Sequence, residues 1–225
     1  MTFSSLSVPL AAQPALSHNV VDVLRDMISH GQLAQGEHLK EAEIATALGV
    51  SRGPVREAFT QLANEGYVEL RRHRGAFVVT LTRHDIDEVY SLRLALERLA
   101  IERAATRMTP ELFAQMDSIL ERIQQVDEGY SPNEAVQLDL EFHDLLYEAA
   151  DHQRLKRSWE FIRSQVEFFL HARNVSRHDF LEVGYLQHRE IRDVLASGDP
   201  EQAGTLIEGH LNLAYSMLLA EHPEP

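Results

Sequence analysis

The sequence predicts a mainly α-helical protein: an N-terminal winged helix-turn-helix followed by an all-α bundle of six helices or slightly more. Two observations support this fold class. Apolar residues recur at helical spacing through most of the chain, and β-forming residues gather only around one basic turn before residue 80. We therefore expect a disordered arm over residues 1–17, a first domain over 18–80 and a helical domain over 81–225.

Composition is that of an ordinary soluble globular protein, with 44% hydrophobic and 25% charged residues. The 225 residues include no cysteine, which excludes disulfides and thiolate metal sites. No apolar run reaches the ~20 residues of a membrane helix. No basic residue precedes Arg25, so the N-terminus does not fit a secretory signal. We expect a cytoplasmic protein with no membrane partner.

The formal net charge of -14 is distributed unevenly along the chain. Residues 18–80 hold 7 Lys/Arg and 8 Asp/Glu, a net charge of -1, whereas residues 81–225 hold 14 and 27, a net charge of -13. The first domain can therefore present a local basic face although the whole protein is acidic.

Three helices are expected in the first domain. The first runs from Asn19 toward Gly31, and the second covers 41–48. Ser51 is the expected N-cap of the third, which ends at Gly66.

A β-hairpin is expected after the third helix. Tyr67, Val68 and Leu70 on one side and residues 77–79 on the other are β-formers. They flank the basic turn Arg71-Arg72-His73-Arg74-Gly75, which has a glycine at its tip.

The first turn of the third helix carries Arg52 and Arg56, although the helix dipole disfavours positive charge there. In a helix-turn-helix, these positions enter the DNA major groove, where arginine can bind guanine O6 and N7. Gly53 would let the backbone approach closely, and the basic wing could contact phosphates or the minor groove. The alternative is a solvated face with surface ion pairs.

Six helices are expected after residue 80. The first starts at Thr82 with Asp85 three residues on, and the last is capped and opened by Asp199-Pro200. The intervening helices start at Pro110 or cover about 133–150, 154–172 and 177–197.

Polar residues occupy core-type positions of these helices. Asp139 and His143 lie four apart beside an apolar stripe, and His188 is in line with Ile191 and Leu195. His210 is expected in the middle of the stripe of Ala203, Ile207, Ala214 and Met217. One carboxylate and three imidazoles suit a divalent transition metal, with Zn or Ni preferred over Mn or Fe. A hydrogen-bonded core histidine is the alternative for each residue singly.

Arg93 and Glu97 fall in the middle of another apolar stripe, on the first helix of the second domain. They either form an internal ion pair or line an effector site in which Arg93 binds a carboxylate.

Residues 36–78, GEHLKEAEIATALGVSRGPVREAFTQLANEGYVELRRHRGAFV, resemble the DNA-binding domain of GntR-family bacterial transcription regulators. The resemblance implies that the operator is contacted by the start of the third helix and by the wing: Ser51, Arg52, Gly53, Arg56, Arg72, Arg74 and Gly75. Gly53 departs from the more usual Thr.

The helical half resembles the FCD effector domain of the FadR-like subfamily. DLEFHDLLYEAA is similar to the metal-binding helix, and HREIRDVLASGDPEQAGTLIEGHL to the last two helices. The resemblance implies a small carboxylate effector beside a metal held by Asp139, His143, His188 and His210. His152 departs from the family, which often has Asn there.

The resulting hypothesis is a metabolite-responsive repressor that binds pseudo-palindromic operator DNA as a homodimer. One alternative is a hydrolase-like metalloenzyme fused to a DNA-binding domain, although the sequence has no HExxH motif and no clear general base. The other is a constitutive DNA binder with a purely structural metal.

Overall fold

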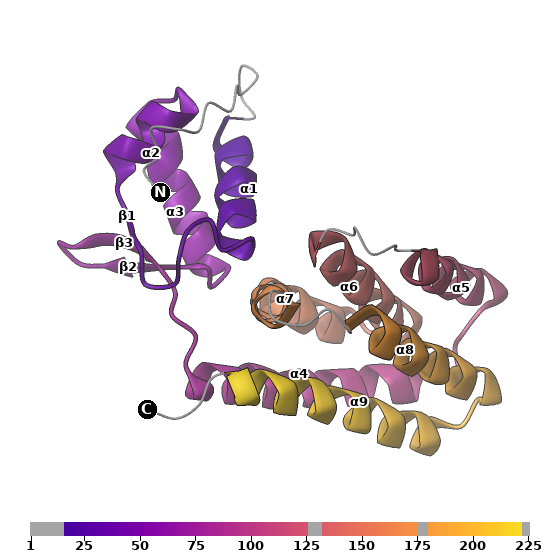
Figure 1. The fold of residues 1–225 in the computed structure, drawn as a ribbon. Helices are drawn as coiled ribbons and strands as arrows, with labels where there is room; N and C mark the ends of the chain where they lie inside the picture. Colours follow the sequence, from indigo (N-terminus) through magenta and orange to yellow (C-terminus); the bar gives the residue numbers. More distant parts are fainter. Residues whose placement is uncertain (1–15, 126–131, 175–179, 222–225) are drawn as a thin grey trace. The chain divides into compact units, whose positions relative to one another are not determined.

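The computed structural model describes residues 16–125, 132–174 and 180–221 and divides into two compact units, Met1–Leu81 and Thr82–Pro225 (Figure 1). Most of the expected N-terminal arm lies outside the described residues. The first helix begins at Leu16, so residues 16 and 17 are helical rather than part of an arm. None of the described helices is long and apolar enough to cross a lipid bilayer.

The first unit is a three-helix domain with a small antiparallel sheet (Figure 1). Its elements are α1 (Leu16–Ser29), β1 (His38–Leu39), α2 (Glu41–Leu48), α3 (Arg52–Asn64), β2 (Val68–Arg71) and β3 (Gly75–Val78). The strand order is β1-β3-β2, so the predicted hairpin is present. The sequence did not indicate β1, because a two-residue strand is too short to show alternation.

The tip of the hairpin depends on glycine. Gly75 has φ +94, and a Cβ there would lie 2.8 Å from Nε2 of His38 on β1. Only glycine adopts this backbone without strain and leaves room for the neighbouring strand. The Arg74 N–H donates to the Arg71 carbonyl at 2.9 Å, which closes the turn.

The second unit is all-helical in its described residues. Its helices are α4 (Arg83–Ala104), α5 (Pro110–Gln125), α6 (Pro132–Ala149), α7 (Gln153–Asn174), α8 (Phe180–Ser197) and α9 (Pro200–Glu221). The six expected helices are all present. Figure 1 shows α4 and α9 side by side. Arg83, the first residue of α4, donates to the Leu219 carbonyl, and Arg98 in the second half of α4 donates to Glu208.

The predicted starts of α4 and α9 are confirmed. Thr82 and Asp85 form a reciprocal capping box. Asp199 accepts hydrogen bonds from the N–H groups of Glu201 and Gln202 at 3.0 and 3.1 Å.

His152 has a local capping role. Its Nδ1 accepts a hydrogen bond from the Leu155 N–H at 3.2 Å, at the start of α7. An asparagine at this position would cap the helix in the same way through its side-chain oxygen. The departure at His152 therefore concerns the helix start rather than the polar cluster.

The core of the second unit brings α4, α6, α7, α8 and α9 around one polar cluster. Trp159 of α7 is buried, and its ring stacks on Tyr147 of α6 with centroids 4.9 Å apart. Its indole N–H donates to Asp144 at 2.6 Å. These contacts fix α6, which carries Asp139 and His143, against α7.

Candidate metal centre and nucleic-acid interface

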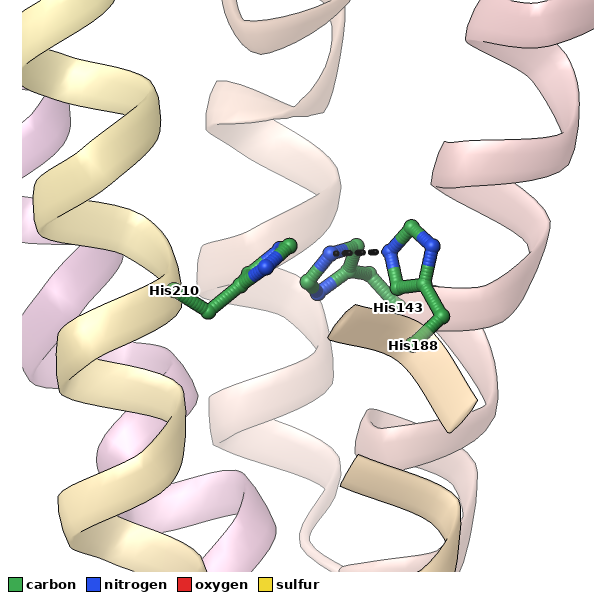
Figure 2. Close-up of side chains that lie close together, drawn as sticks. All are labelled: His143, His188 and His210. Atoms are coloured by element: carbon green, nitrogen blue, oxygen red, sulfur yellow. Dashed lines mark hydrogen bonds between the residues drawn. The ribbon is translucent and has the colours of Figure 1, made fainter. Parts of the chain in front are cut away.

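Three histidines from three helices converge inside the second unit. His143 of α6, His188 of α8 and His210 of α9 offer nitrogen atoms that all lie within 4.8 Å of one another. Figure 2 shows the three rings directed toward one another, with Nε2 of His143 and Nε2 of His188 3.4 Å apart. The packing therefore assembles three of the four predicted ligands into one group able to hold a metal ion.

The side chains next to His143 and His210 determine which ring nitrogen of each can bind a metal ion. Nδ1 of His143 lies 2.6 Å from the Glu97 carboxylate, and Nδ1 of His210 lies 2.9 Å from the side-chain oxygen of Gln187. Because both partners are acceptors, they favour the proton on Nδ1 and leave Nε2 as the lone-pair donor. This pattern is common around metal-binding histidines.

His188 is held in its neutral form. Burial lowers its pKa to about 4, although the charge of Asp139 opposes this effect. A neutral imidazole is the form that binds a metal, so near pH 7 this residue needs no deprotonation to act as a ligand.

Asp139 lies at the edge of the histidine group rather than within it. Its Oδ1 is 3.6 Å from Nε2 of His188, and the residue is only 4% exposed. Three imidazoles with an adjacent buried carboxylate are a donor set that fits a divalent transition metal.

His210 differs from the sequence prediction. The buried stripe of α9 contains Ala203, Ile207, Leu211, Ala214 and Leu218. His210 lies beside this stripe and is half-buried, rather than central to it. It borders a groove of about 370 Å³ that is lined by α8 and α9 residues, including Gln187 and Glu190. The cluster can therefore be approached from this side.

Arg93 and Glu97 form the internal ion pair that the sequence allowed. Arg93 is 1% exposed and Glu97 is 0% exposed, and Nε of Arg93 donates to Oε1 of Glu97 at 2.5 Å. Burial alone would raise the pKa of Glu97, but the charge of Arg93 and the hydrogen bonds from His143 and Arg93 outweigh it and lower that pKa to about 2. The Glu97 charge likewise outweighs burial at Arg93, whose pKa is raised.

The ion pair does not satisfy every polar atom around it. Nη2 of Arg93 and the hydroxyl of Tyr147 are buried and have no hydrogen-bond partner among the described residues. The Arg93 guanidinium also lies over the Trp159 ring, 5.7 Å from its centroid. Because buried polar atoms without partners are costly, an anionic or polar ligand that met these two atoms would satisfy them.

The predicted DNA-contacting residues of α3 are at the surface of the first unit. Ser51, Arg52, Gly53 and Arg56 are all exposed. Ser51 has the extended backbone of an N-cap, as predicted, but its side chain makes no capping hydrogen bond. Its hydroxyl therefore remains available to an outside acceptor such as a phosphate.

A groove of about 770 Å³ lies between α3 and the hairpin. It is lined by Arg52 and Arg56 of α3 and by Arg71, Arg72 and Gly75 of the wing. Arg71 stacks over Phe77, 4.4 Å from the ring centroid, and pairs with Glu69 at 2.8 Å. Arg72 and Arg74 are exposed at the turn. Positive side chains therefore line both sides of the groove.

Several residues in these sites carried no signal in the sequence. Glu41 of α2 pairs with Arg56 at 2.6 Å, and Gln187 fixes the His210 ring. Both contacts join different helices, so spacing could not reveal them. Tyr147 lies four residues after His143, and helical spacing could have placed it beside the cluster.

Both units match known families. Residues 16–78 match the description "Bacterial regulatory proteins, gntR family", and residues 88–213 match "FCD domain". The chain belongs to the GntR family of bacterial transcription regulators. This GntR regulator with an FCD domain is therefore a DNA-binding protein rather than an enzyme, and the resemblance drawn from residues 36–78 is confirmed.

Two bacterial transcriptional repressors are similar to this chain. The chain is 32% identical over 198 residues to a probable D-xylose utilization operon transcriptional repressor of Paenarthrobacter nicotinovorans, covering 87% of this chain and 85% of that one. It is 34% identical over 147 residues to the gluconate operon transcriptional repressor of Bacillus subtilis (strain 168), covering 65% and 60%.

Solved structures share the fold. A putative GntR transcriptional regulator from Rhodococcus sp. RHA1 superposes with a TM-score of 0.77 at 27% identity, covering 93% of this chain and 100% of that one. E. coli McbR/YncC also has a TM-score of 0.77, at 21% identity and with 94% and 100% coverage, and shows the fold alone.

The depressed pKa of His188 predicts acid sensitivity of the metal-free protein. Below about pH 6.5 the unfolded chain binds a proton that folded His188 excludes. The free energy of unfolding should fall as pH drops from about 6.5 to about 4, by on the order of 1–3 kcal/mol from this group. Urea unfolding of chelator-treated protein at several pH values measures this. His188→Gln should reduce the dependence of the free energy of unfolding on pH, whereas His84→Gln, which changes an exposed histidine, should not. Equal pH dependence in the two variants would contradict the assignment to His188.

Gly53 has no structural reason to be glycine within the protein. A Cβ there would meet only the Ser51 hydroxyl, at 3.9 Å. Gly53→Ala should therefore raise the free energy of unfolding, by up to about 1 kcal/mol, through helix propensity. Operator affinity should fall, because the added methyl group would block the predicted close approach of DNA to the backbone at this position. Chemical denaturation and a DNA titration measure the two effects, and unchanged DNA affinity would remove the proposed close approach.

Proposed function

We propose that this GntR regulator is a repressor whose FCD domain binds one divalent transition metal and a small organic-acid effector. The observation that carries the proposal is the group of His143, His188 and His210 beside the buried Arg93, whose Nη2 has no partner among the described residues. The three imidazoles would be ligands of the metal ion, and a carboxylate of the effector would accept a hydrogen bond from the Arg93 guanidinium.

Metal binding is supported by the donor set. His143, His188 and His210 would hold the ion, with Asp139 as a fourth ligand beside His188. Zn or Ni suits this set best, and Mn or Fe are further candidates. When bound, the metal supplies a positive charge and open coordination positions for an effector oxygen.

Effector binding is supported by the residues on the Arg93 side of the cluster. Glu97 is occupied by Arg93 and His143, so its role is to hold these two groups rather than to contact the effector directly. Arg93 has a terminal nitrogen available for a carboxylate, and Tyr147 has an available hydroxyl. The proposed effector is therefore a small acid that contacts these two groups.

DNA binding is proposed to use the groove between α3 and the wing. Arg52 and Arg56 would read bases from the major groove, Ser51 and Gly53 would meet the backbone, and Arg72, Arg74 and Gly75 of the wing would contact phosphates or the minor groove. Because its target is bacterial operator DNA, we place the protein in the cytoplasm.

A homodimer on a pseudo-palindromic operator is part of the proposal. Leu92 and Leu99 on α4 and Leu213 on α9 are exposed by 45%, 43% and 39%. The pairing of α4 with α9 places Leu92 and Leu213 at the same level along the two helices, and we propose that these exposed side chains contact a second copy. A stoichiometry of one chain per operator would contradict the dimer.

Thermal shift tests the metal and the effector together. Zn or Ni at about 100 times its Kd should raise the Tm of chelator-treated protein by about 5–10 °C. A panel of small organic acids should contain one that raises Tm further, and only when metal is present. His210→Gln should abolish both shifts. Arg93→Lys keeps the charge but loses the planar fork, so it should keep the metal shift and weaken the acid shift.

The alternative of a structural metal predicts a different result. The metal would then raise Tm, but no acid would raise it further or change operator affinity. His84→Gln removes an exposed histidine and serves as the control. A metal shift that persists in His210→Gln would contradict the proposed ligand set.

Removing either α3 arginine should weaken operator binding. Arg52→Ala and Arg56→Ala should each cost roughly 1–3 kcal/mol if these side chains make bidentate base contacts. Fluorescence anisotropy with an operator selected from random duplex DNA measures the Kd and the stoichiometry. Arg189→Ala, an exposed arginine in the other unit, is the control. Equal Kd values for the α3 variants and wild type would exclude the base contacts.

A further inference from the structure

A carboxylate lies against both arginines at the start of α3. Glu41 is the first residue of α2, and its Oε2 accepts a hydrogen bond from Nε of Arg56 at 2.6 Å. Its Oε1 lies 4.0 Å from Nε of Arg52. That oxygen is buried and accepts no hydrogen bond from the described residues. One acidic side chain therefore faces both of the side chains proposed to read DNA.

The atoms that make these contacts leave the base-reading edge available. A guanidinium has five N–H donors in a fixed plane, and Glu41 approaches each arginine from the Nε side. The terminal nitrogens of Arg52 and Arg56 stay open, and the two side chains are 64% and 68% exposed. A bidentate contact to guanine needs this terminal edge in a set orientation.

We propose that Glu41 is a positioning residue for sequence-specific DNA binding. It orients Arg56 and draws Arg52 toward the same carboxylate, so that both present their terminal nitrogens to base edges. The inference rests on the DNA contacts of α3 proposed above. It adds a protein residue that determines specificity without touching DNA.

The charge of Glu41 also acts against non-specific binding. Binding to arbitrary DNA depends on phosphate neutralisation by Lys and Arg, and an acidic group among these cations weakens it. An arginine that turned toward a phosphate would have to leave Glu41, whereas one that reads guanine keeps the contact. Specificity is the difference between the affinities for operator and for arbitrary DNA. Glu41 increases this difference because it strengthens operator binding and weakens non-specific binding.

A purely structural role for Glu41 is the competing explanation. An acidic residue in the first turn of α2 stabilises that helix through its dipole. Glu43 also lies in the first turn of α2, and it pairs with Lys40 at 2.8 Å. Glu43→Gln therefore removes the same charge from the same helix turn and is the matched control.

Affinity for two DNA duplexes tests the proposal. The operator is the sequence that the wild-type chain selects from random duplex DNA, and the second probe is a scrambled duplex of equal length and composition. Glu41→Gln should weaken operator binding severalfold and tighten binding to the scrambled duplex, so that the ratio of the two Kd values falls about tenfold. Glu43→Gln should leave the ratio within about twofold of wild type.

The outcomes separate the alternatives. A ratio for Glu41→Gln equal to that of Glu43→Gln would overturn the proposal. An equal loss on both duplexes together with a lowered Tm would show a role in folding and would also overturn it. A wild-type chain that selects no sequence would overturn operator binding itself, and the role of Glu41 with it.

Discussion

The polar interior of the FCD unit depends on the contacts of one buried carboxylate, that of Glu97. It lies 2.5 Å from Nε of Arg93 and 2.6 Å from Nδ1 of His143, with no exposed surface. An isolated buried carboxylate would cost several kcal/mol, so its two partners are what keep it ionised. In return it fixes the Arg93 guanidinium and the tautomer of His143. The Glu97 side chain therefore links α4 to α6, and it links the Arg93 guanidinium to the histidine cluster.

This arrangement gives a physical route for coupling between the proposed metal and effector. Arg93 contacts Oε1 of Glu97 and His143 contacts Oε2 of the same carboxylate, so an anion that drew Arg93 away would strengthen the hold of Glu97 on His143. Loss of the His143 contact would likewise strengthen its hold on Arg93. Such coupling is reciprocal: each ligand changes the affinity for the other by the same factor. A purely structural metal would not require the buried donor of Arg93 beside it.

The DNA-binding unit uses acidic residues in a comparable way. Glu41 lies among the cations of the α3 groove, as Glu97 lies between Arg93 and His143. The two settings differ in exposure, because Arg52 and Arg56 are open to solvent and their ion pairs are screened. The proposed role of Glu41 is therefore in orientation and selectivity rather than in stability. Gly53 is likewise explained by the proposed DNA contact rather than by stability, since nothing in the protein requires a glycine there.

The sequence by itself determined the six helices of the second unit, the starts of α4 and α9, and a set of candidate site residues. Helical spacing placed Arg93 and Glu97 in a buried stripe, and local signals at Thr82 and Asp199 marked helix starts, because these features depend on near neighbours. The tertiary structure decided the partners. Glu97 meets His143, His210 lies beside its stripe, and Arg56 pairs with Glu41 rather than the adjacent Glu57. The contacts of Glu97 and of Arg56 each join separate helices, and the position of His210 depends on how α9 is rotated against its neighbours. No sequence period records that rotation.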